Sequence, residues 1–131
     1  MSNWTHVAGI IRIDDFRWNN KVPDFEKIFG KTVRFADDWK NISEEETLPL
    51  GSEGSLAMSV YVNPNINYLS AYVVSIFGDL RDHDDPKEII EWFKDKCKVA
   101  DKAFCGVRNA CIVAENEING TATWFLGGKE E

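Results

Sequence analysis

The chain has 131 residues, the length of one ordinary domain, and 44% of them are hydrophobic. A chain of this length buries roughly two-thirds of the surface it exposes when unfolded, and five tryptophans and eight phenylalanines supply a core. Its 22 acidic and 15 basic residues give a formal net charge of −7, which phosphate backbones and anionic lipid repel. We therefore expect a single soluble domain over residues 1–131 that contacts neither nucleic acid nor membrane directly. The acidic surface suits a basic protein partner or serves solubility alone.

No targeting or membrane-spanning segment is evident. Met1 to Trp4 lead directly into a strand-like run, without the basic and apolar regions of a signal peptide, and no apolar stretch approaches the ~20 residues of a membrane span. The cysteines Cys97, Cys105 and Cys111 are odd in number and lack a Cys-x-x-Cys or His/Cys pairing. We expect a reducing, cytoplasmic location with no disulfide, no metal site and no cofactor.

The first half of the chain predicts a strand, a short helix and a second strand. Residues 4–13 carry apolar side chains on both faces, which is typical of a strand inside a sheet. One face consists of Val7, Ile11 and Ile13, and the other of Trp4, His6, Ala8 and Ile10. Pro23 at a first helical position and Gly30 after the last turn bound the helix. We expect a brief strand at residues 32–35 and an irregular acidic loop over residues 36–53.

The second half begins with a hairpin. Residues 55–62 alternate, with Leu56, Met58, Val60 and Val62 on one face. The turn residues Asn63-Pro64-Asn65 lead into a long Tyr-, Val- and Ile-rich strand over residues 68–77.

A second helix and a second hairpin follow. Asp85 as cap, Pro86 at the first position and Glu88 three residues after the cap mark the start of the helix. Its buried stripe consists of Ile89, Ile90, Phe93 and Cys97. A strand over residues 107–115 then returns through the type I′ dipeptide Asn119-Gly120 as residues 121–126.

The expected element order is β-α-β-β-β-α-β-β. Its nearest simple architecture is an α+β fold of the ferredoxin-like, split β-α-β type, with both helices on one face of an antiparallel sheet. The other face would be uncovered. Outward-facing aromatic residues would then favour a homo-oligomer or a ligand platform, and we expect them at Tyr61, Tyr68, Tyr72 and Trp124.

The most conspicuous polar run is residues 78–85, Gly-Asp-Leu-Arg-Asp-His-Asp-Asp. Its carboxylates and His83 suit a hard cation or acid/base chemistry, but the spacing does not match a calcium loop. A structural role explains much of the run, because Asp85 caps the helix and nearby carboxylates favour its positive end. Arg81 is the candidate ligand residue, since a strand-end arginine suits a carboxylate or phosphate.

A Gly/Ser loop is the second candidate. Gly51 and Gly54 are able to present successive backbone N–H groups to an anion, and Ser52 and Ser55 add donors. The loop is not a P-loop, because no Gly-Lys-Ser/Thr sequence or helix follows, and a turn that needs positive φ is the alternative.

Three further residues complete the predicted ligand set. Trp4 or Tyr72 would supply an aromatic contact for a small anionic ligand such as a nucleotide, beside Arg81 and the Gly/Ser loop. His6 is either a packed strand residue or part of this site.

Support for a conventional enzyme is weak. No Ser or Cys lies in a nucleophile motif, so no triad is predicted. Cys97 and Cys111 are interpreted as core residues, and Cys105 as the candidate reactive thiol, although nothing marks it as activated. The alternative to a binding protein is a small enzyme that cleaves a phosphorylated or nucleotide substrate, with acid/base and partner residues drawn from His6, His83, Asp79 and Asp82.

Three stretches together resemble a family of small, functionally uncharacterised proteins encoded by bacteriophages and prophages. They are Trp-Thr-His-Val-Ala-Gly at residues 4–9, Pro-Leu-Gly-Ser-Glu-Gly at 49–54 and Phe-Gly-Asp-Leu-Arg-Asp at 77–82. The resemblance runs from residue 4 to about residue 115, and residues 36–48 depart from it. It implies no catalytic residues.

The resemblance suggests a phage-encoded, non-catalytic binding protein that antagonises a host process in the host cytoplasm, such as defence. Two mechanisms remain open. The protein sequesters a small phosphorylated signalling ligand, or its acidic surface blocks a host nucleic-acid-binding protein. An assembly role in the phage particle is a third interpretation.

Overall fold

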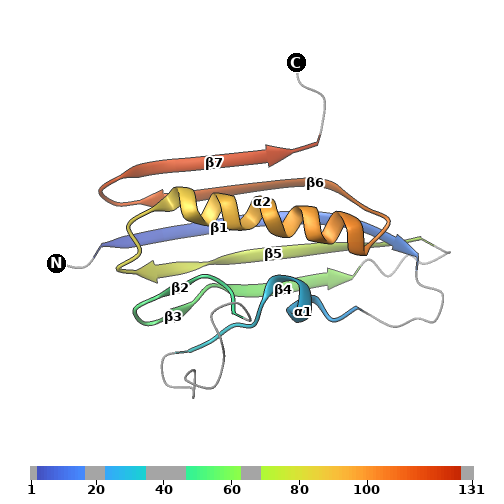
Figure 1. The fold of residues 1–131 in the computed structure, drawn as a ribbon, viewed down its shortest axis with the longest axis horizontal. Helices are drawn as coiled ribbons and strands as arrows, with labels where there is room; N and C mark the ends of the chain where they lie inside the picture. The colour runs from blue at the N-terminus through green and yellow to red at the C-terminus, as the bar shows by residue number, and fades with distance from the viewer. Residues whose placement is uncertain (1–2, 17–22, 35–46, 63–68, 128–131) are drawn as a thin grey trace.

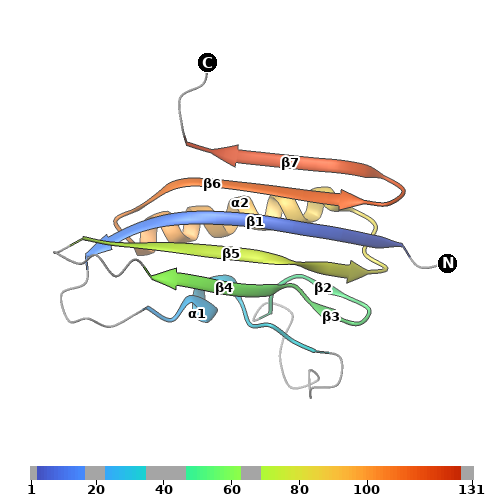
Figure 2. The same cartoon turned by 180° about the vertical axis from the view of Figure 1, so that it is seen from behind.

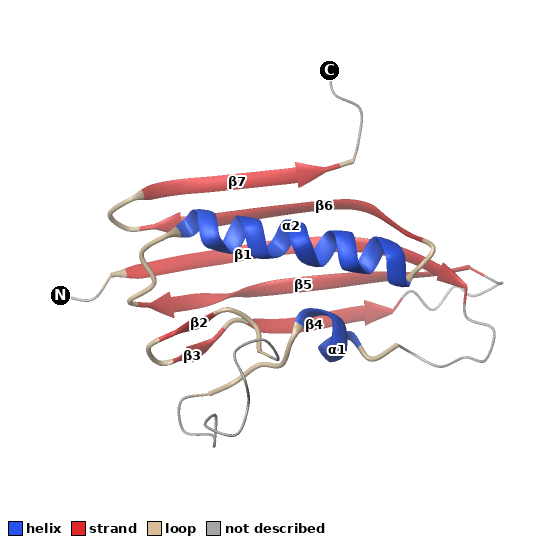
Figure 3. Cartoon of the chain, viewed as in Figure 1, coloured by secondary structure: helices blue, strands red, loops and turns tan. Residues whose placement is uncertain are grey.

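The computed structural model describes residues 3–16, 23–34, 47–62 and 69–127. The fold is α+β, with a five-stranded antiparallel sheet and two helices (Figures 1 and 3). In chain order the elements are β1 (Trp4–Phe16), α1 (Phe25–Phe29), β2 (Leu50–Gly51), β3 (Gly54–Ser55), β4 (Ala57–Val62), β5 (Leu69–Arg81), α2 (Pro86–Ala103), β6 (Gly106–Asn116) and β7 (Gly120–Leu126).

The sheet is organised around β1. The strand order is β4-β5-β1-β6-β7, and every neighbouring pair is antiparallel. The prediction of a central first strand is therefore confirmed. The small β2–β3 hairpin forms a separate sheet beside the end of β5, where the Ser52 N–H donates to the Arg81 carbonyl oxygen over 2.8 Å.

Both helices lie on one face of the sheet, and Figure 2 shows the opposite face with no described element across it. Val7, Ile11 and Ile13 of β1 point toward the helices and are at most 5% exposed, as their alternation predicts. We call the opposite side the open face. It carries the even-numbered residues of β1 and their strand neighbours in the register.

The helix α2 begins and packs as its sequence predicts. The Asp85 side chain accepts a hydrogen bond from the Lys87 N–H over 3.0 Å, and Pro86 opens the helix. The predicted stripe is buried: Ile89, Ile90, Phe93 and Cys97. Gly9 of β1 permits this contact, because an added Cβ would lie 3.1 Å from Cε1 of Phe93.

Two of the expected outward aromatics face the helices instead. Tyr72 is fully buried, and its ring lies 5.2 Å from that of Phe25 in an edge-to-face contact. The Trp124 ring packs edge-to-face on Phe93 at 5.9 Å. Tyr61 does lie on the open face, 59% exposed, whereas Tyr68 falls outside the described residues. The error has a physical reason: β5 is apolar on both faces, so alternation does not orient it.

Three boundaries also differ from expectation. Asp24, and not Pro23, borders the first turn of α1, because its side chain accepts from the Glu26 N–H over 3.1 Å. The strand expected at residues 32–35 is reduced, within the described part, to an isolated bridge between Arg34 and Gly54. The expected loop over residues 36–53 contains β2, and its residues 36–46 lie outside the described ranges.

Two further expectations concern the last third of the chain. The hairpin of β6 and β7 is confirmed, but its turn is not the expected type I′ turn: Asn116 pairs with Gly120 across a loop of residues 117–119. Gly120, at φ 91°, opens β7, while Asn119 lacks the positive φ that type I′ requires. Cys97 is buried as expected, but Cys111 is exposed on the open face and is not a core residue. No helix in the described ranges has the length and apolar character to cross a membrane.

Candidate functional site

Most of the predicted ligand residues meet at one end of the sheet. Trp4 is the register partner of Arg81, and His6 pairs with Asp79 two residues further along the same two strands. The β2–β3 turn closes against the same point: an added Cβ at Gly51 would lie 2.7 Å from the Arg81 carbonyl oxygen, so only glycine allows this approach. Tyr72 pairs with Ile13 at the opposite end of β5, so it is not part of this group.

The Arg81 guanidinium is held by carboxylates. Its Nη1 atom donates to Oε1 of Glu53, and its Nε atom lies 3.9 Å from Oδ2 of Asp82. Asp82 also accepts a hydrogen bond from the Ser52 hydroxyl over 2.9 Å. Glu53 was missed in the sequence, because its position opposite Arg81 depends on how the hairpin closes. The charge that would attract an anionic ligand is therefore already balanced.

Backbone donors of the Gly/Ser loop are used within the fold. The Ser52 N–H donates to the Arg81 carbonyl oxygen and the Ser55 N–H to that of Val33, over 2.8 and 2.9 Å. Gly51 and Gly54 pair with each other as β2 and β3. Gly54 has φ 133°, which agrees with the turn interpretation of this loop and not with an anion-binding nest.

His6 lies between two carboxylates. Its Nδ1 atom is 2.6 Å from Oδ1 of Asp79, and its Nε2 atom is 3.6 Å from Oε2 of Glu117. The hydrogen bond with Asp79 raises the pKa of His6 above 6.5, against the opposing effect of burial. The imidazole is 42% exposed. The arrangement stabilises the protonated form, which suits an ion pair better than a general base.

His83 forms contacts that hold the loop before α2 in place. Its backbone carbonyl oxygen accepts hydrogen bonds from the Thr5 hydroxyl and from Nδ2 of Asn116. Its ring Nε2 lies 3.6 Å from Oε2 of Glu88, and its buried Nδ1 has no hydrogen-bond partner within the described ranges. Most of this polar run is thus explained by loop and cap contacts. The buried polar residues Thr5 and Asn116 carried no motif that would have marked them.

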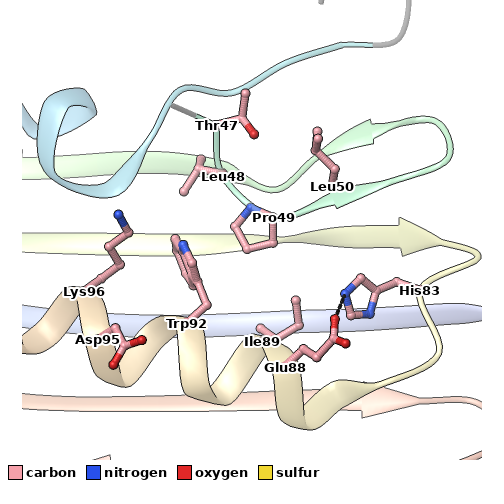
Figure 4. Close-up of a pocket in the computed structure, with 10 residues that line it drawn as sticks. All are labelled: Thr47, Leu48, Pro49, Leu50, His83, Glu88, Ile89, Trp92, Asp95 and Lys96. Carbon is pink, nitrogen blue, oxygen red and sulfur yellow. Dashed lines mark ion pairs between the residues drawn. The ribbon is translucent and has the colours of Figure 1, made fainter. Parts of the chain in front are cut away.

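An open hollow of about 580 Å³ lies between α2 and residues 47–50 (Figure 4). Ile89 and Trp92 line it from the helix, and His83 lies at one end beside Glu88. Among its charged side chains, the carboxylates of Glu88 and Asp95 outnumber the single ammonium group of Lys96. The hollow therefore has no excess positive charge for an anion, and Arg81 and His6 are not among its lining residues.

Most of the exposed large apolar side chains within the described ranges lie on the open face. Five large side chains on it are between 44% and 69% exposed: Ile10, Tyr61, Phe77, Val113 and Phe125. The sequence did indicate a second apolar face, because β1 and β5 are apolar on both sides. It did not show which residues of these strands point outward. The described residues contain no group of His, Cys, Asp and Glu that could hold a metal ion.

No protein-family model, curated protein or solved structure matches this chain. Functional inference therefore depends on the geometry of the molecule.

Proposed function

We propose that this chain is a non-catalytic binding protein that engages a basic surface of a protein partner through the acidic end of its sheet. The main observation that supports the proposal is the ion pair between Arg81 and Glu53. It turns the predicted anion site into a surface dominated by carboxylates. Of the two mechanisms open at the sequence level, acidic blocking is therefore favoured over sequestration of a phosphorylated ligand.

Acidic side chains gather where the β2–β3 turn, the end of β5, the start of α2 and the β6–β7 turn meet. The carboxylates of this acidic end are Glu53, Asp79, Asp82, Asp84, Asp85, Glu88, Glu115 and Glu117. The basic residues at this end are Arg34, Arg81 and Lys87, together with two histidines. Such a concentration of negative charge steers a basic partner and repels nucleic acid itself.

The resemblance to phage and prophage proteins supplies the biological context of the proposal. An acidic protein made in the host cytoplasm would block a host nucleic-acid-binding protein, for example one that acts in defence, by occupying its phosphate-binding surface.

The test is capture from a nuclease-treated bacterial lysate by the full chain. We expect a nucleic-acid-binding protein that is released by rising salt and displaced by double-stranded DNA. The combined variant Asp82→Asn, Asp84→Asn, Glu88→Gln should weaken its binding about tenfold or more, which is about 1.4 kcal/mol. The control Glu26→Gln, Glu91→Gln, Asp95→Asn removes the same charge elsewhere and should bind normally.

Binding that is insensitive to salt, or lost equally in both variants, would contradict acidic blocking. A phosphorylated small molecule retained by the purified protein in native mass spectrometry would favour sequestration instead. Replacement of Arg81 by Ala separates the two mechanisms further, since only sequestration requires its guanidinium.

The His6–Asp79 pair supports the alternative, a small enzyme acting on a phosphorylated or nucleotide substrate. The pair has the 2.6 Å spacing of a hydrogen-bonded acid/base couple, although Glu117 lies at the other ring nitrogen. Turnover of a nucleotide panel with divalent metals, lost in His6→Gln, would establish it. No consumption on long incubation would exclude this alternative.

We also propose that the fold is of the ferredoxin-like, split β-α-β type, extended by one strand. The strand order supports this assignment, because β5 lies between β1 and β4 and β6 lies on the other side of β1. The edge strand β7 would then be the addition.

A further inference from the structure

Side chains on the open face, most of them apolar, form two neighbouring rows across four of the strands. The first row runs through Phe77, Ala8, Val113 and Thr123, and the second through Ser75, Ile10, Cys111 and Phe125. The strands β5, β1, β6 and β7 each contribute one residue to each row. Within each of these four strands, a larger side chain in one row is followed by a smaller one in the other.

We propose that a second copy of this chain covers the open face, forming a two-fold dimer in which the two sheets pack face to face. The proposal rests on the apolar residues of the open face, and of the carboxylates of the acidic end it involves only Asp79 and Glu115, so it is tested independently of the proposed function. The carboxylates of the β2–β3 turn and of the α2 start lie outside the face and remain available to a partner.

The area of the face matches what a stable dimer requires. Each strand residue covers about 16 Å² of sheet, given spacings of about 3.3 Å along and 4.8 Å between strands. The five strands therefore present on the order of 800 Å², which equals the contribution of one partner to a standard specific interface.

Charge selects the orientation of the two copies. Asp79 and Glu115 lie on the open face at the acidic end, on strands that flank β1 on opposite sides. A two-fold axis parallel to the strands would place Asp79 over Glu115 of the second copy, which opposes like charges. An axis perpendicular to the strands instead places these carboxylates over the end that carries Arg12 and Arg108.

That end carries charges of both signs, so the perpendicular axis avoids the repulsion between like carboxylates. Arg108 is 59% exposed and lies 3.7 Å from Asp14. The Nε atom of Arg12 is buried and has no hydrogen-bond partner within the described ranges.

Side-chain size selects the same axis. Suppose that the two-fold axis runs perpendicular to the strands and passes between the two rows. Each strand then lies over the same strand of the second copy, and each residue of one row lies over the residue two positions along that strand. Ile10 then lies over Ala8, Phe77 over Ser75 and Phe125 over Thr123, so large side chains meet small ones. A hollow of about 330 Å³ beside Ile10, Cys111 and Phe125 leaves room for such interdigitation.

The first test is sedimentation of the full chain over a range of concentrations. We expect a dimer, and Ile10→Lys should raise its dissociation constant at least about a hundredfold, because each dimer buries two such side chains. Val99→Lys is the matched control: Val99 is 47% exposed but lies on α2, and its variant should dimerise normally. Circular dichroism checks that both variants fold.

A monomer at all concentrations would overturn the proposal, as would a dimer that Ile10→Lys leaves intact. The orientation has its own test. Asn109→Lys places an ammonium group over Glu115 of the second copy if the axis is perpendicular, and should tighten the dimer roughly threefold or more. With a parallel axis it would lie over Val73 and weaken the dimer, which would refute the perpendicular axis.

Discussion

Asn116 donates a hydrogen bond from its side-chain amide to the hydroxyl oxygen of Thr5, 111 residues earlier in the chain, over 3.0 Å. Both residues are at most 2% exposed. The same amide and the Thr5 hydroxyl also donate to the carbonyl oxygen of His83. These bonds join β1, β6 and the loop before α2 at the acidic end, where a strand end, a turn and a helix start must be held together.

Asn116→Ala should lower the free energy of unfolding by about 1–3 kcal/mol, because the Ile118 and Asn119 N–H groups lose their side-chain acceptor. Urea unfolding measures the change. The control Asn109→Ala alters an exposed residue on the same strand and should stay within about 0.5 kcal/mol. Equal effects of the two substitutions would show that this polar cluster does not stabilise the fold.

Gly9→Ala should destabilise the protein by about 1–3 kcal/mol, since the added methyl meets the Phe93 ring and Ile112. If this contact is the cause, combining it with Phe93→Leu should cost less than the sum of the single changes. Strict additivity in urea unfolding would contradict that explanation.

Asp79→Asn should lower the pKa of His6 toward 6.5, because the bond with Asp79 is the largest cause of its elevation. The folded pKa lies above the unfolded value. The stabilising contribution of the pair is therefore fully present below pH 6.5 while Asp79 is ionised, and is lost as pH rises through the folded pKa. Histidine NMR titration of both proteins measures the shift, and an unchanged His6 pKa would contradict the pairing.

The cysteines should differ sharply in reactivity. Burial raises the pKa of Cys97 to about 12, so its thiol should not react with a disulfide reagent in the folded protein at pH 8. Cys105 and Cys111 are both exposed in the single chain. Cys105 should react rapidly, and Cys111 should do so unless a second copy covers the open face. Thiol titration before and after unfolding in urea counts the protected groups, and Cys105→Ser should remove the contribution of Cys105 alone. Labelling of Cys97 in the folded state would contradict its burial.

Much of the fold was predictable from local sequence signals. The cap at Asp85 and the stripe of α2 located that helix, and the alternation of Val7, Ile11 and Ile13 gave the buried face of β1. By contrast, Tyr72 and Val73 are both apolar neighbours on β5. Which of them faces the core is decided by pairing with β1 and not by local pattern.

The candidate site was only partly predictable. The sequence marked Arg81 and the Gly/Ser loop as separate features, and the structure brings them together. The sequence did not identify Glu53 as the partner of Arg81, because an ion pair between residues far apart in the chain produces no periodic sequence pattern. The residues of the open face were equally difficult to predict. A strand that is apolar on both sides has no pattern that indicates which side the helices cover.

The central position of β1 has a consequence for biosynthesis. This strand leaves the ribosome before the rest of the sheet, yet its two neighbours, β5 and β6, are completed only at Arg81 and Asn116. The nascent chain must therefore carry an unpaired apolar strand until these two strands have been synthesised. Such non-local pairing implies slow folding and a need for protection from aggregation while the chain emerges.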